Sequence, residues 1–267
     1  MESLLGQDFA TLPILALGAF AFLAGFIDAV VGGGGLIQIP ALLVLQPQLA
    51  PAAVFGTNKF AAIWGTASAT VQYARRVPID WRIVLPAALV AMVTSYLGAH
   101  AVSLIDKATL KPLVLALLVV LLVYTLWKKD FGALHAPRLG NGMQYVAAAA
   151  TGGVIGFYDG FFGPGTGSFL IFAFVGLFGF GFLPASASAK AVNSITNLAA
   201  LVYFATSGSV VYALAVPMAI CNVAGSIIGS RLAIAKGNQF VRGLFVIVVG
   251  LLVARFAWDL LPAASKP

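Results

Sequence analysis

The composition of this 267-residue chain is that of a membrane protein. Hydrophobic residues make up 61% of the sequence and charged residues only 9%, and the mean hydropathy is +1.02. A soluble domain carries roughly 25% charged residues, so this chain cannot cover its apolar side chains in water. The net charge of +7 fits positive loops on the cytoplasmic side of a membrane. There is no segment for a solvated basic domain, so we expect no nucleic-acid partner.

Apolar segments follow one another along the whole chain. Several reach the ~20 residues that a membrane-spanning helix needs. The first has no basic region before it and no cleavage site after it, so we expect a retained segment and not a signal peptide. Two short ones follow glycine runs, which favours half-helices. The segments are 12–31, 36–45, 52–74, 83–105, 112–127, 143–162, 168–183, 185–206, 210–230 and 240–261. We therefore expect an all-α polytopic membrane protein.

A glycine-rich stretch with an acid before it and a lysine after it occurs twice. The first copy contains Asp28, four consecutive glycines and Lys59. The pattern recurs 131 residues later, with Asp159 and Lys190 at the corresponding positions. An offset that holds without gaps over about seventy residues indicates that the whole half is duplicated. The predicted parts are a first repeat over 1–127, a cytoplasmic connector over 128–142 and a second repeat over 143–267.

The distribution of basic residues favours one of two topologies. If each glycine-rich segment enters the membrane and returns, each half has three further spans and the halves lie upside down to each other. Both chain ends are then outside, in the periplasm, with nine basic residues inside and four outside. Two full crossings, with the N-terminus inside, give eight against five. We expect two inverted repeats, each with a Gly-rich, broken or re-entrant helix hairpin plus three transmembrane helices.

Inverted repeats are a recurrent design of secondary transporters, in which interrupted helices build a site between the repeats. Irregular backbone at membrane depth is tolerated only where protein or a water-filled cavity satisfies it. The four glycines at 32–35 therefore predict a cavity or very close packing. Elsewhere, glycine in a membrane helix is typical of a contact face, as expected for Gly98 and Gly229.

Two lysines and the small polar residues around them form the candidate binding site. A buried ammonium costs about 2.5–3.5 kcal/mol unless a partner compensates it. Around Lys190, polar residues follow at the spacing of one helix face. Ammonium groups with amide and hydroxyl donors are the composition of an anion site, and half-helix N-termini would add backbone N–H groups. The candidate substrate-binding residues are Lys59, Lys190, Thr57, Asn58, Thr66, Asn193, Ser194, Asn197, Gly34, Gly35, Gly165 and Gly167.

Asp28 and Asp159 have three competing interpretations. They could form structural ion pairs, Asp28 with Lys190 and Asp159 with Lys59, because the four intramembrane charges sum to zero. They could instead accept the N–H groups of the following glycine turn. As proton carriers, they would couple transport to the proton gradient. For the lysines, a functional role is favoured over a structural one, because ionisable residues inside membranes usually mark function.

The sequence contains no pattern typical of an enzyme or a metal protein. The glycine-rich stretches lack the flanking strand and the Gly-Lys-Ser/Thr ending of a phosphate loop. No Gly-x-Ser-x-Gly motif is present. Cys221 is the single cysteine, and His100 and His135 are far apart. We expect no catalytic residues, no metal and no cofactor.

Three motifs resemble the sulfite exporter TauE/SafE family. They are the repeated G-F-x-D-x-x-x-G-x-G run, G-T-N-K-F-A-A-I-W-G-T at 56–66 and K-A-V-N-S-I-T-N-L-A-A-L at 190–201. The resemblance runs from about residue 12 to 258. It implies a multi-spanning inner-membrane permease that exports sulfite or organosulfonates. Pro164 and Thr166 depart from the first copy, where glycines stand, so the two hairpins are not expected to be equivalent.

The leading hypothesis is a transporter that exports small sulfur-containing anions across the inner membrane by alternating access. Its expected partners are the anion and the lipid bilayer, and a homodimer is left open. One alternative is an ion channel or proton-linked pathway that uses Asp28 and Asp159. Another is a non-transporting membrane subunit in which the lysine–aspartate pairs only serve packing. The sequence does not identify the anion or the coupling ion.

Overall fold

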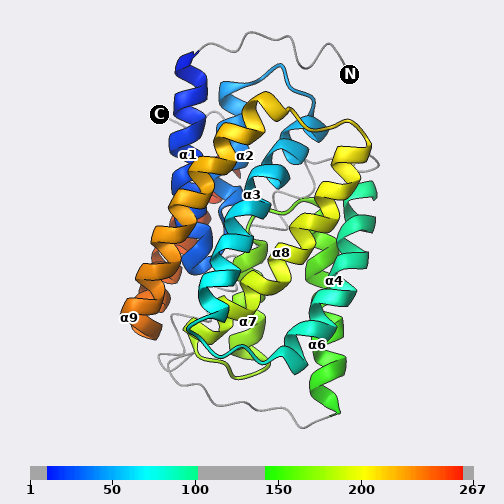
Figure 1. Cartoon of the computed structure of the whole chain (residues 1–267), viewed down its shortest axis with the longest axis vertical. Coiled ribbons are helices and arrows are strands. Elements are labelled where there is room, and N and C mark those ends of the chain that lie inside the picture. Colours follow the sequence, from blue (N-terminus) through cyan, green and yellow to red (C-terminus); the bar gives the residue numbers. More distant parts are fainter. Residues whose placement is uncertain (1–10, 102–141, 261–267) are drawn as a thin grey trace.

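The computed structural model describes residues 11–101 and 142–260, and within these ranges every regular element is an α-helix (Figure 1). This confirms the expected all-α class for the described part. The predicted span 112–127, the connector at 128–142 except its last residue, and both chain ends lie outside the described residues.

The helices fall into two sets separated by the undescribed stretch. The first set is α1 (Thr11–Val31), α2 (Gly35–Leu45), α3 (Pro51–Ala74) and α4 (Trp81–Ala101). The second set is α6 (Met143–Phe161), α7 (Thr166–Gly176), α8 (Phe182–Thr206) and α9 (Tyr212–Leu260), where α9 contains a break at Gly237 with φ +72°.

The surface of the helices is apolar, as a lipid environment requires. Within residues 11–101 and 142–260, three segments are long and apolar enough to cross a bilayer, namely Pro13–Val31, Trp81–Ala101 and Tyr212–Val248. Large apolar side chains point outward, among them Leu15, Val44 and Val154, each more than 70% exposed. A monomeric soluble protein does not expose apolar surface on this scale. The chain is a multi-pass membrane protein.

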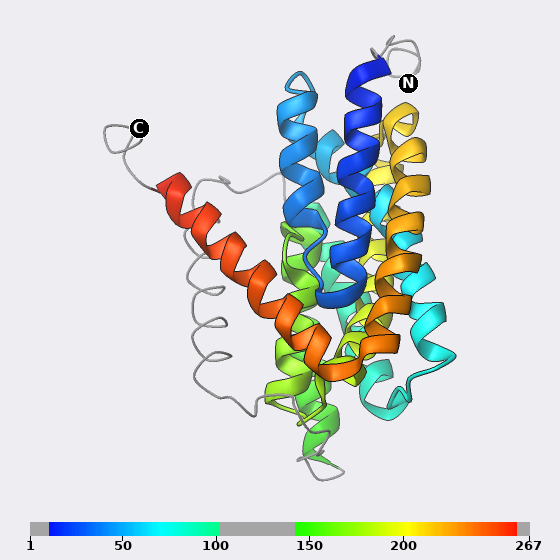
Figure 2. The same ribbon diagram turned by 90° about the vertical axis from the view of Figure 1, so that its left-hand side faces the viewer.

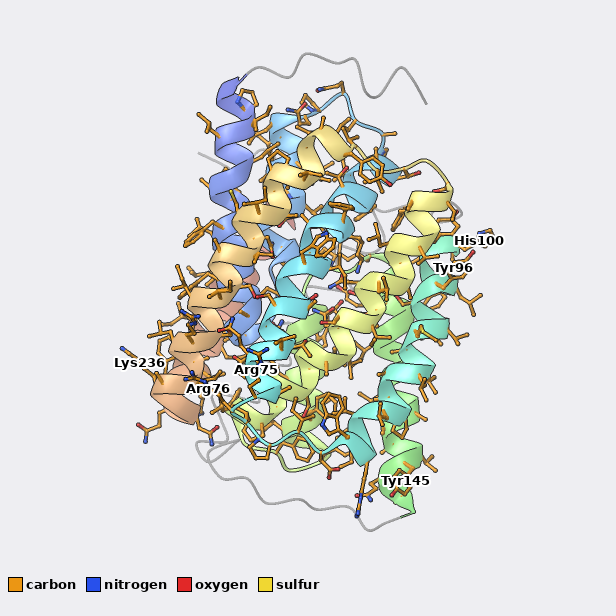
Figure 3. All side chains as sticks on the ribbon, viewed as in Figure 1. Arg75, Arg76, Tyr96, His100, Tyr145 and Lys236 are labelled. Carbon is orange, nitrogen blue, oxygen red and sulfur yellow. The ribbon has the colours of Figure 1, made fainter. Side chains whose placement is uncertain are left out.

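Corresponding helices of the two sets have matching bounds and opposite directions. The helices α7, α8 and α9 begin 131 residues after α2, α3 and α4. In Figure 1, α1 and α3 run downward, whereas α6 and α8 run upward; α4 runs upward, whereas the first part of α9 runs downward. Arg75, Arg76 and Lys236 lie in the lower half of the molecule and His100 in the upper half (Figure 3).

Each short helix forms a hairpin with the helix before it. Figure 2 shows α2 running back toward the end at which α1 begins. The first turn has positive φ at Gly32 (+73°) and Gly33 (+110°), and the second at Gly163 (+84°) and Gly165 (+86°). Residues with a Cβ rarely adopt this conformation. Proline cannot adopt it, so Pro164 forces a turn different from that at Gly33.

The tips of the two hairpins touch through their backbones. A Cβ on Gly167 would lie 2.6 Å from Cα of Gly32, and a Cβ on Gly32 would overlap the backbone of Gly167 and Ser168. The glycine run thus provides close packing at Gly32, and the next glycines line a cavity described below. Both outcomes that the sequence suggested for residues 32–35 occur, at different glycines.

Glycines also set the distance between long helices. Gly152, Gly156 and Gly160 of α6 lie against backbone atoms of α4, and Gly225 and Gly229 of α9 lie against Phe22 and Phe26 of α1. The expected contact roles of Gly98 and Gly229 are confirmed, because Gly98 also has no room for a side chain against Phe157 and Phe161. Small residues that let membrane helices approach closely are the usual means of packing them.

Replacing Gly167 with alanine should destabilise the protein. The added methyl group would enter the contact with Gly32, at a cost of roughly 1–3 kcal/mol as in other overpacked sites. The matched control is Gly243→Ala in α9, where an added Cβ would meet nothing within 4 Å and alanine favours the helix. Thermal unfolding of the detergent-solubilised protein should show a lower midpoint for Gly167→Ala alone. Equal midpoints for both variants would contradict the tip contact.

Candidate functional site

Two buried ion pairs cross between the two sets of helices. Nζ of Lys59 in α3 lies 2.6 Å from Oδ2 of Asp159 in α6, and the two side chains are 4% and 2% exposed. Nζ of Lys190 in α8 lies 2.8 Å from Oδ2 of Asp28 in α1, with exposures of 0% and 15%. These are the partners that the ion-pair interpretation of the sequence gave. Each pair joins a lysine of one half to the hairpin of the other.

Side chains also hold the turns of the two hairpins, and Asp28 is one of them. The second carboxylate oxygen of Asp28 accepts a hydrogen bond from the N–H of Gly34 at 3.3 Å, so this carboxylate holds both the lysine and the glycine turn. In the second hairpin, the turn is held by Tyr158, whose hydroxyl donates to the carbonyl of Pro164 at 2.6 Å. The Thr166 hydroxyl donates to the carbonyl of Gly163 at 2.7 Å.

Side-chain hydroxyl groups donate hydrogen bonds to the last carbonyl groups of α1 inside the protein. The last carbonyls of a helix have no partner within it, and at membrane depth water does not replace one. Tyr73 donates to the carbonyl of Ala29, Ser186 to that of Val30, and Ser168 to those of Val31 and Gly32. Polar residues of α7 and α8 are therefore used to support an interrupted helix of the other half.

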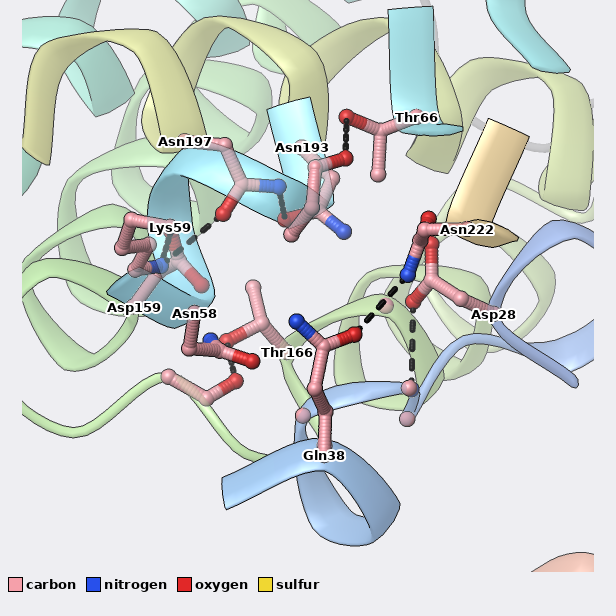
Figure 4. Close-up of a pocket in the computed structure, with 17 residues that line it drawn as sticks. Asp28, Gln38, Asn58, Lys59, Thr66, Asp159, Thr166, Asn193, Asn197 and Asn222 are labelled. Carbon is pink, nitrogen blue, oxygen red and sulfur yellow. Dashed lines mark hydrogen bonds and ion pairs between the residues drawn. The ribbon is translucent and has the colours of Figure 1, made fainter. Parts of the chain in front are cut away.

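A small polar cavity lies between the hairpins and the long helices (Figure 4). Its volume is about 30 Å³, which is room for about two water molecules. The glycine turns, Lys59, both aspartates and several amide side chains form its wall. The lining residues are Asp28, Gly33, Gly34, Gly35, Gln38, Asn58, Lys59, Ala62, Thr66, Asp159, Gly163, Gly165, Thr166, Gly167, Asn193, Asn197 and Asn222.

Lys59 is the positive group of this cavity. Its ammonium donates to Asp159 and, at 3.0 Å, to Oδ1 of Asn197. Because an ammonium carries three donor hydrogens, these two bonds leave one further donor. The N-termini of α2 and α7 begin at the same cavity with Gly35 and Thr166. The positive ends of two helix dipoles and one ammonium therefore converge on a cavity that also contains two carboxylates, Asp159 paired with Lys59 and Asp28 paired with Lys190.

Two buried polar atoms of the cavity wall have no hydrogen-bond partner in the part of the chain that the structure describes. They are Nε2 of Gln38 and Oδ1 of Asn58. The other amide atom of Gln38, Oε1, accepts from Nδ2 of Asn222 at 2.9 Å, which orients the side chain (Figure 4). A buried polar group without a partner costs about 1–3 kcal/mol. Such groups indicate a site that water or a polar ligand completes.

Most of the residues proposed from the sequence meet at this cavity, but three do not line it. Thr57 is fully buried, and its hydroxyl accepts from the N–H of Val211. Ser194 donates to the carbonyl of Lys190 and contacts the hydroxyl of Thr70. Lys190 is enclosed beside Asp28 and Gly167. The pair of Lys190 and Asp28 therefore joins α8 to the first hairpin behind the cavity wall, with Asp28 alone facing inward.

Gln38, Thr166 and Asn222 line the cavity but were not among the predicted binding residues. Gln38 is a single polar residue in the apolar half-helix G-L-I-Q-I-P, and that isolation was a usable signal. Asn222 has no polar counterpart 131 residues earlier, where Ala91 stands. A search guided by the duplication therefore passes over it.

The fold and the site define a multi-pass membrane transporter, and comparisons with known proteins agree. The chain matches the sulfite exporter TauE/SafE family over residues 17–256 and belongs to this family, which confirms the resemblance. It is 37% identical over 253 residues to the probable membrane transporter protein ORF9 of Sinorhizobium sp., covering 95% of both chains.

Two further relatives carry similar descriptions. The probable membrane transporter protein YfcA of Escherichia coli K12 is 36% identical, with 90% of this chain and 87% of that protein covered. A probable membrane transporter protein of Haemophilus influenzae is 33% identical, with 89% and 92% covered. No solved structure matches.

Neutralising one partner of the ion pair between Lys190 and Asp28 should lower the stability of the protein more than neutralising both. Lys190→Gln leaves Asp28 as an uncompensated buried charge, and Asp28→Asn leaves Lys190 as one. Each single variant should lower the free energy of unfolding by about 3–5 kcal/mol. The double variant has no such charge, and asparagine can still accept from Gly34. A double-mutant cycle on thermal stability should therefore show strong coupling. Additive losses would mean that the pair contributes little across the two halves.

Proposed function

We propose that the protein is a secondary transporter that exports small sulfur-containing oxyanions, such as sulfite or an organosulfonate, across the inner membrane by alternating access. The observation that carries the proposal is the position of Lys59, an ammonium in a polar cavity between two hairpins from different halves. The family description supports the substrate class. A tetrahedral or pyramidal oxyanion is matched by ammonium, amide and helix N-terminal donors.

The orientation of the protein in the membrane follows from the charged residues outside the central site. Among the described residues, basic side chains lie near the end of α3, at the start of α4 and on either side of the break in α9, namely Arg75, Arg76, Arg82, Arg231, Lys236 and Arg242. The positive-inside rule makes this end cytoplasmic. Both chain ends are then periplasmic, and the two halves are inverted repeats over 1–127 and 143–267. The matching helix bounds and the opposite helix directions support this assignment.

The cavity is too small for the substrate in this conformation. A space of about 30 Å³ holds about two water molecules and is too small for a sulfonate. Binding therefore requires the hairpin tips to separate at Gly32 and Gly167. Moving α1 and α2 opens the cavity toward the periplasm, whereas moving α6 and α7 opens it toward the cytoplasm. The ion pairs between the halves break and form as the two movements alternate.

The charge of the site sets what travels with the anion. Lys59, Lys190, Asp28 and Asp159 sum to zero, so a monoanion alone would leave one uncompensated negative charge, at several kcal/mol in a dry interior. We propose that the anion takes the place of Asp159 beside Lys59 and that Asp159 takes up a proton. The group paired with Asp159 is Lys59, whose ammonium also donates to Asn197. Anion and proton then move in the same direction as a neutral unit.

Two double variants test whether Lys59 binds the anion. Each removes one ion pair between the halves without leaving a lone charge: Lys59→Gln with Asp159→Asn, and Lys190→Gln with Asp28→Asn. Only the first removes the ammonium that lines the cavity. Sulfite, taurine and sulfoacetate binding to the purified protein should fall by about a hundredfold or more in the first variant, as for loss of a charged hydrogen bond. The second variant should keep its affinity within about tenfold.

Measurements on the same purified proteins distinguish the proposed transporter from an ion channel and from a structural subunit. Transport in proteoliposomes should saturate with substrate and exchange labelled for unlabelled anion. Unchanged affinity in the variant without Lys59 would refute the site. Ion currents far above transporter turnover would favour a channel, and the absence of any transport would favour a structural subunit.

A further inference from the structure

A groove runs along the outside of the protein between α3 and the first part of α9. Its lower section has a volume of about 540 Å³ and its upper section about 470 Å³. The two sections share Trp64 and Val223, so they adjoin one another along α3 and α9. The central cavity, by contrast, has a volume of only about 30 Å³. The groove is therefore suited to a long ligand.

The groove is separate from the central cavity. Between them, α3 and α9 are in direct contact, because Gly65 has no room for a side chain against Asn222 and its carbonyl accepts from the hydroxyl of Ser226 at 2.6 Å. Thr66 and Asn222 face the cavity, whereas Trp64, Ala67 and Ile227 face the groove. A ligand of the groove is thus independent of the transported anion.

The two ends of the groove differ in chemistry. The upper section is lined only by apolar side chains, which are Phe60, Trp64, Val216, Ala219, Ile220 and Val223. The lower end carries three arginines, Arg75, Arg76 and Arg231. From Phe60 to Ala74, the last residue of α3 before the arginines, the helix rises about 21 Å at ~1.5 Å per residue. This exceeds the ~15 Å half-thickness of the hydrocarbon core, so an acyl chain fits along the groove from the arginines upward.

The arginines have no carboxylate partner among residues 11–101 and 142–260, where both ion pairs belong to the central site. Nε of Arg231 donates to Oε1 of Gln72 at 3.2 Å, and Nε2 of Gln72 is buried without a partner in the described part of the molecule. Guanidinium groups bind phosphate oxygens through paired hydrogen bonds. An additional amide donor lies beside them.

We propose that this groove binds an anionic phospholipid of the cytoplasmic leaflet. The phosphate lies between Arg75, Arg76 and Arg231, and one acyl chain follows Trp64 and Val223 upward. This occupant matches the basic end and the apolar length together. A second copy of the chain fits less well. A two-fold axis along the membrane normal places the same ends together, so the arginines of both copies would face one another.

Native mass spectrometry of the purified full chain tests the proposal, with dioleoyl phosphatidylglycerol and dioleoyl phosphatidylcholine as probes. The wild-type protein should retain phosphatidylglycerol about tenfold better than phosphatidylcholine, as expected for several basic residues at a membrane surface. Arg75→Gln, Arg76→Gln and Arg231→Gln together should abolish this preference. Arg82→Gln is the control, because Arg82 is exposed at the start of α4 and does not line the groove.

A second pair of variants tests the apolar section without changing charge. Ala67→Trp fills the groove and should lower retention of both lipids. Val93→Trp should not lower it, because Val93 lies in α4, outside the groove, and is 57% exposed. The proposal is overturned if the wild-type protein shows no headgroup preference, or if Arg82→Gln has the effect of the triple variant. It is also overturned if Ala67→Trp splits a dimer and leaves lipid retention unchanged, which would make the groove a contact between copies.

Discussion

The structure depends on two ammonium–carboxylate pairs that cross between its halves at the level of the interrupted helices. Burying four charged groups in an apolar protein is unfavourable unless each finds a partner, and here each partner comes from the other half. The pairing therefore specifies how the halves meet. In the proposed transport cycle the contact is also reversible, because charges that gain or lose a competing ion or a proton can exchange partners. An apolar contact of the same size would offer no such control.

Close packing and open space are combined within a few residues of one another. Gly32 and Gly167 bring two backbones into contact, while Gly33, Gly34 and Gly35 form part of a cavity wall. Glycine permits both, since it accepts positive φ and leaves no side chain. The carbonyls freed by the interruption are bound by Tyr73, Ser168 and Ser186. The polar residues in the long helices thus have two purposes, support of the hairpins and formation of the cavity, and only the second concerns a substrate.

The sequence predicted the helices and the hairpins, and it gave the ion-pair partners as one of three interpretations of the aspartates, because each leaves a pattern that repeats. The offset between Lys59 and Lys190 places α3 and α8 in equivalent positions, and the isolated charges in apolar segments have few possible partners. The residues that line the cavity were harder to predict from the sequence. Spacing along one helix grouped Ser194 with Asn193 and Asn197, yet Ser194 turns to Thr70. Gln38 and Asn222 come together across helices that no local pattern connects. Lys59 lines the cavity and Lys190 does not, and this difference likewise arises from tertiary packing.

The most direct test of the account is the number of protons taken up when an anion binds. Isothermal titration calorimetry with isethionate, a sulfonate monoanion that does not titrate near neutral pH, can be repeated in buffers of different ionisation enthalpy. Because the buried charges already cancel, the wild-type protein should take up about one proton per anion, and Asp159→Asn should take up none. Binding of isethionate to the wild-type protein without proton uptake would contradict the account.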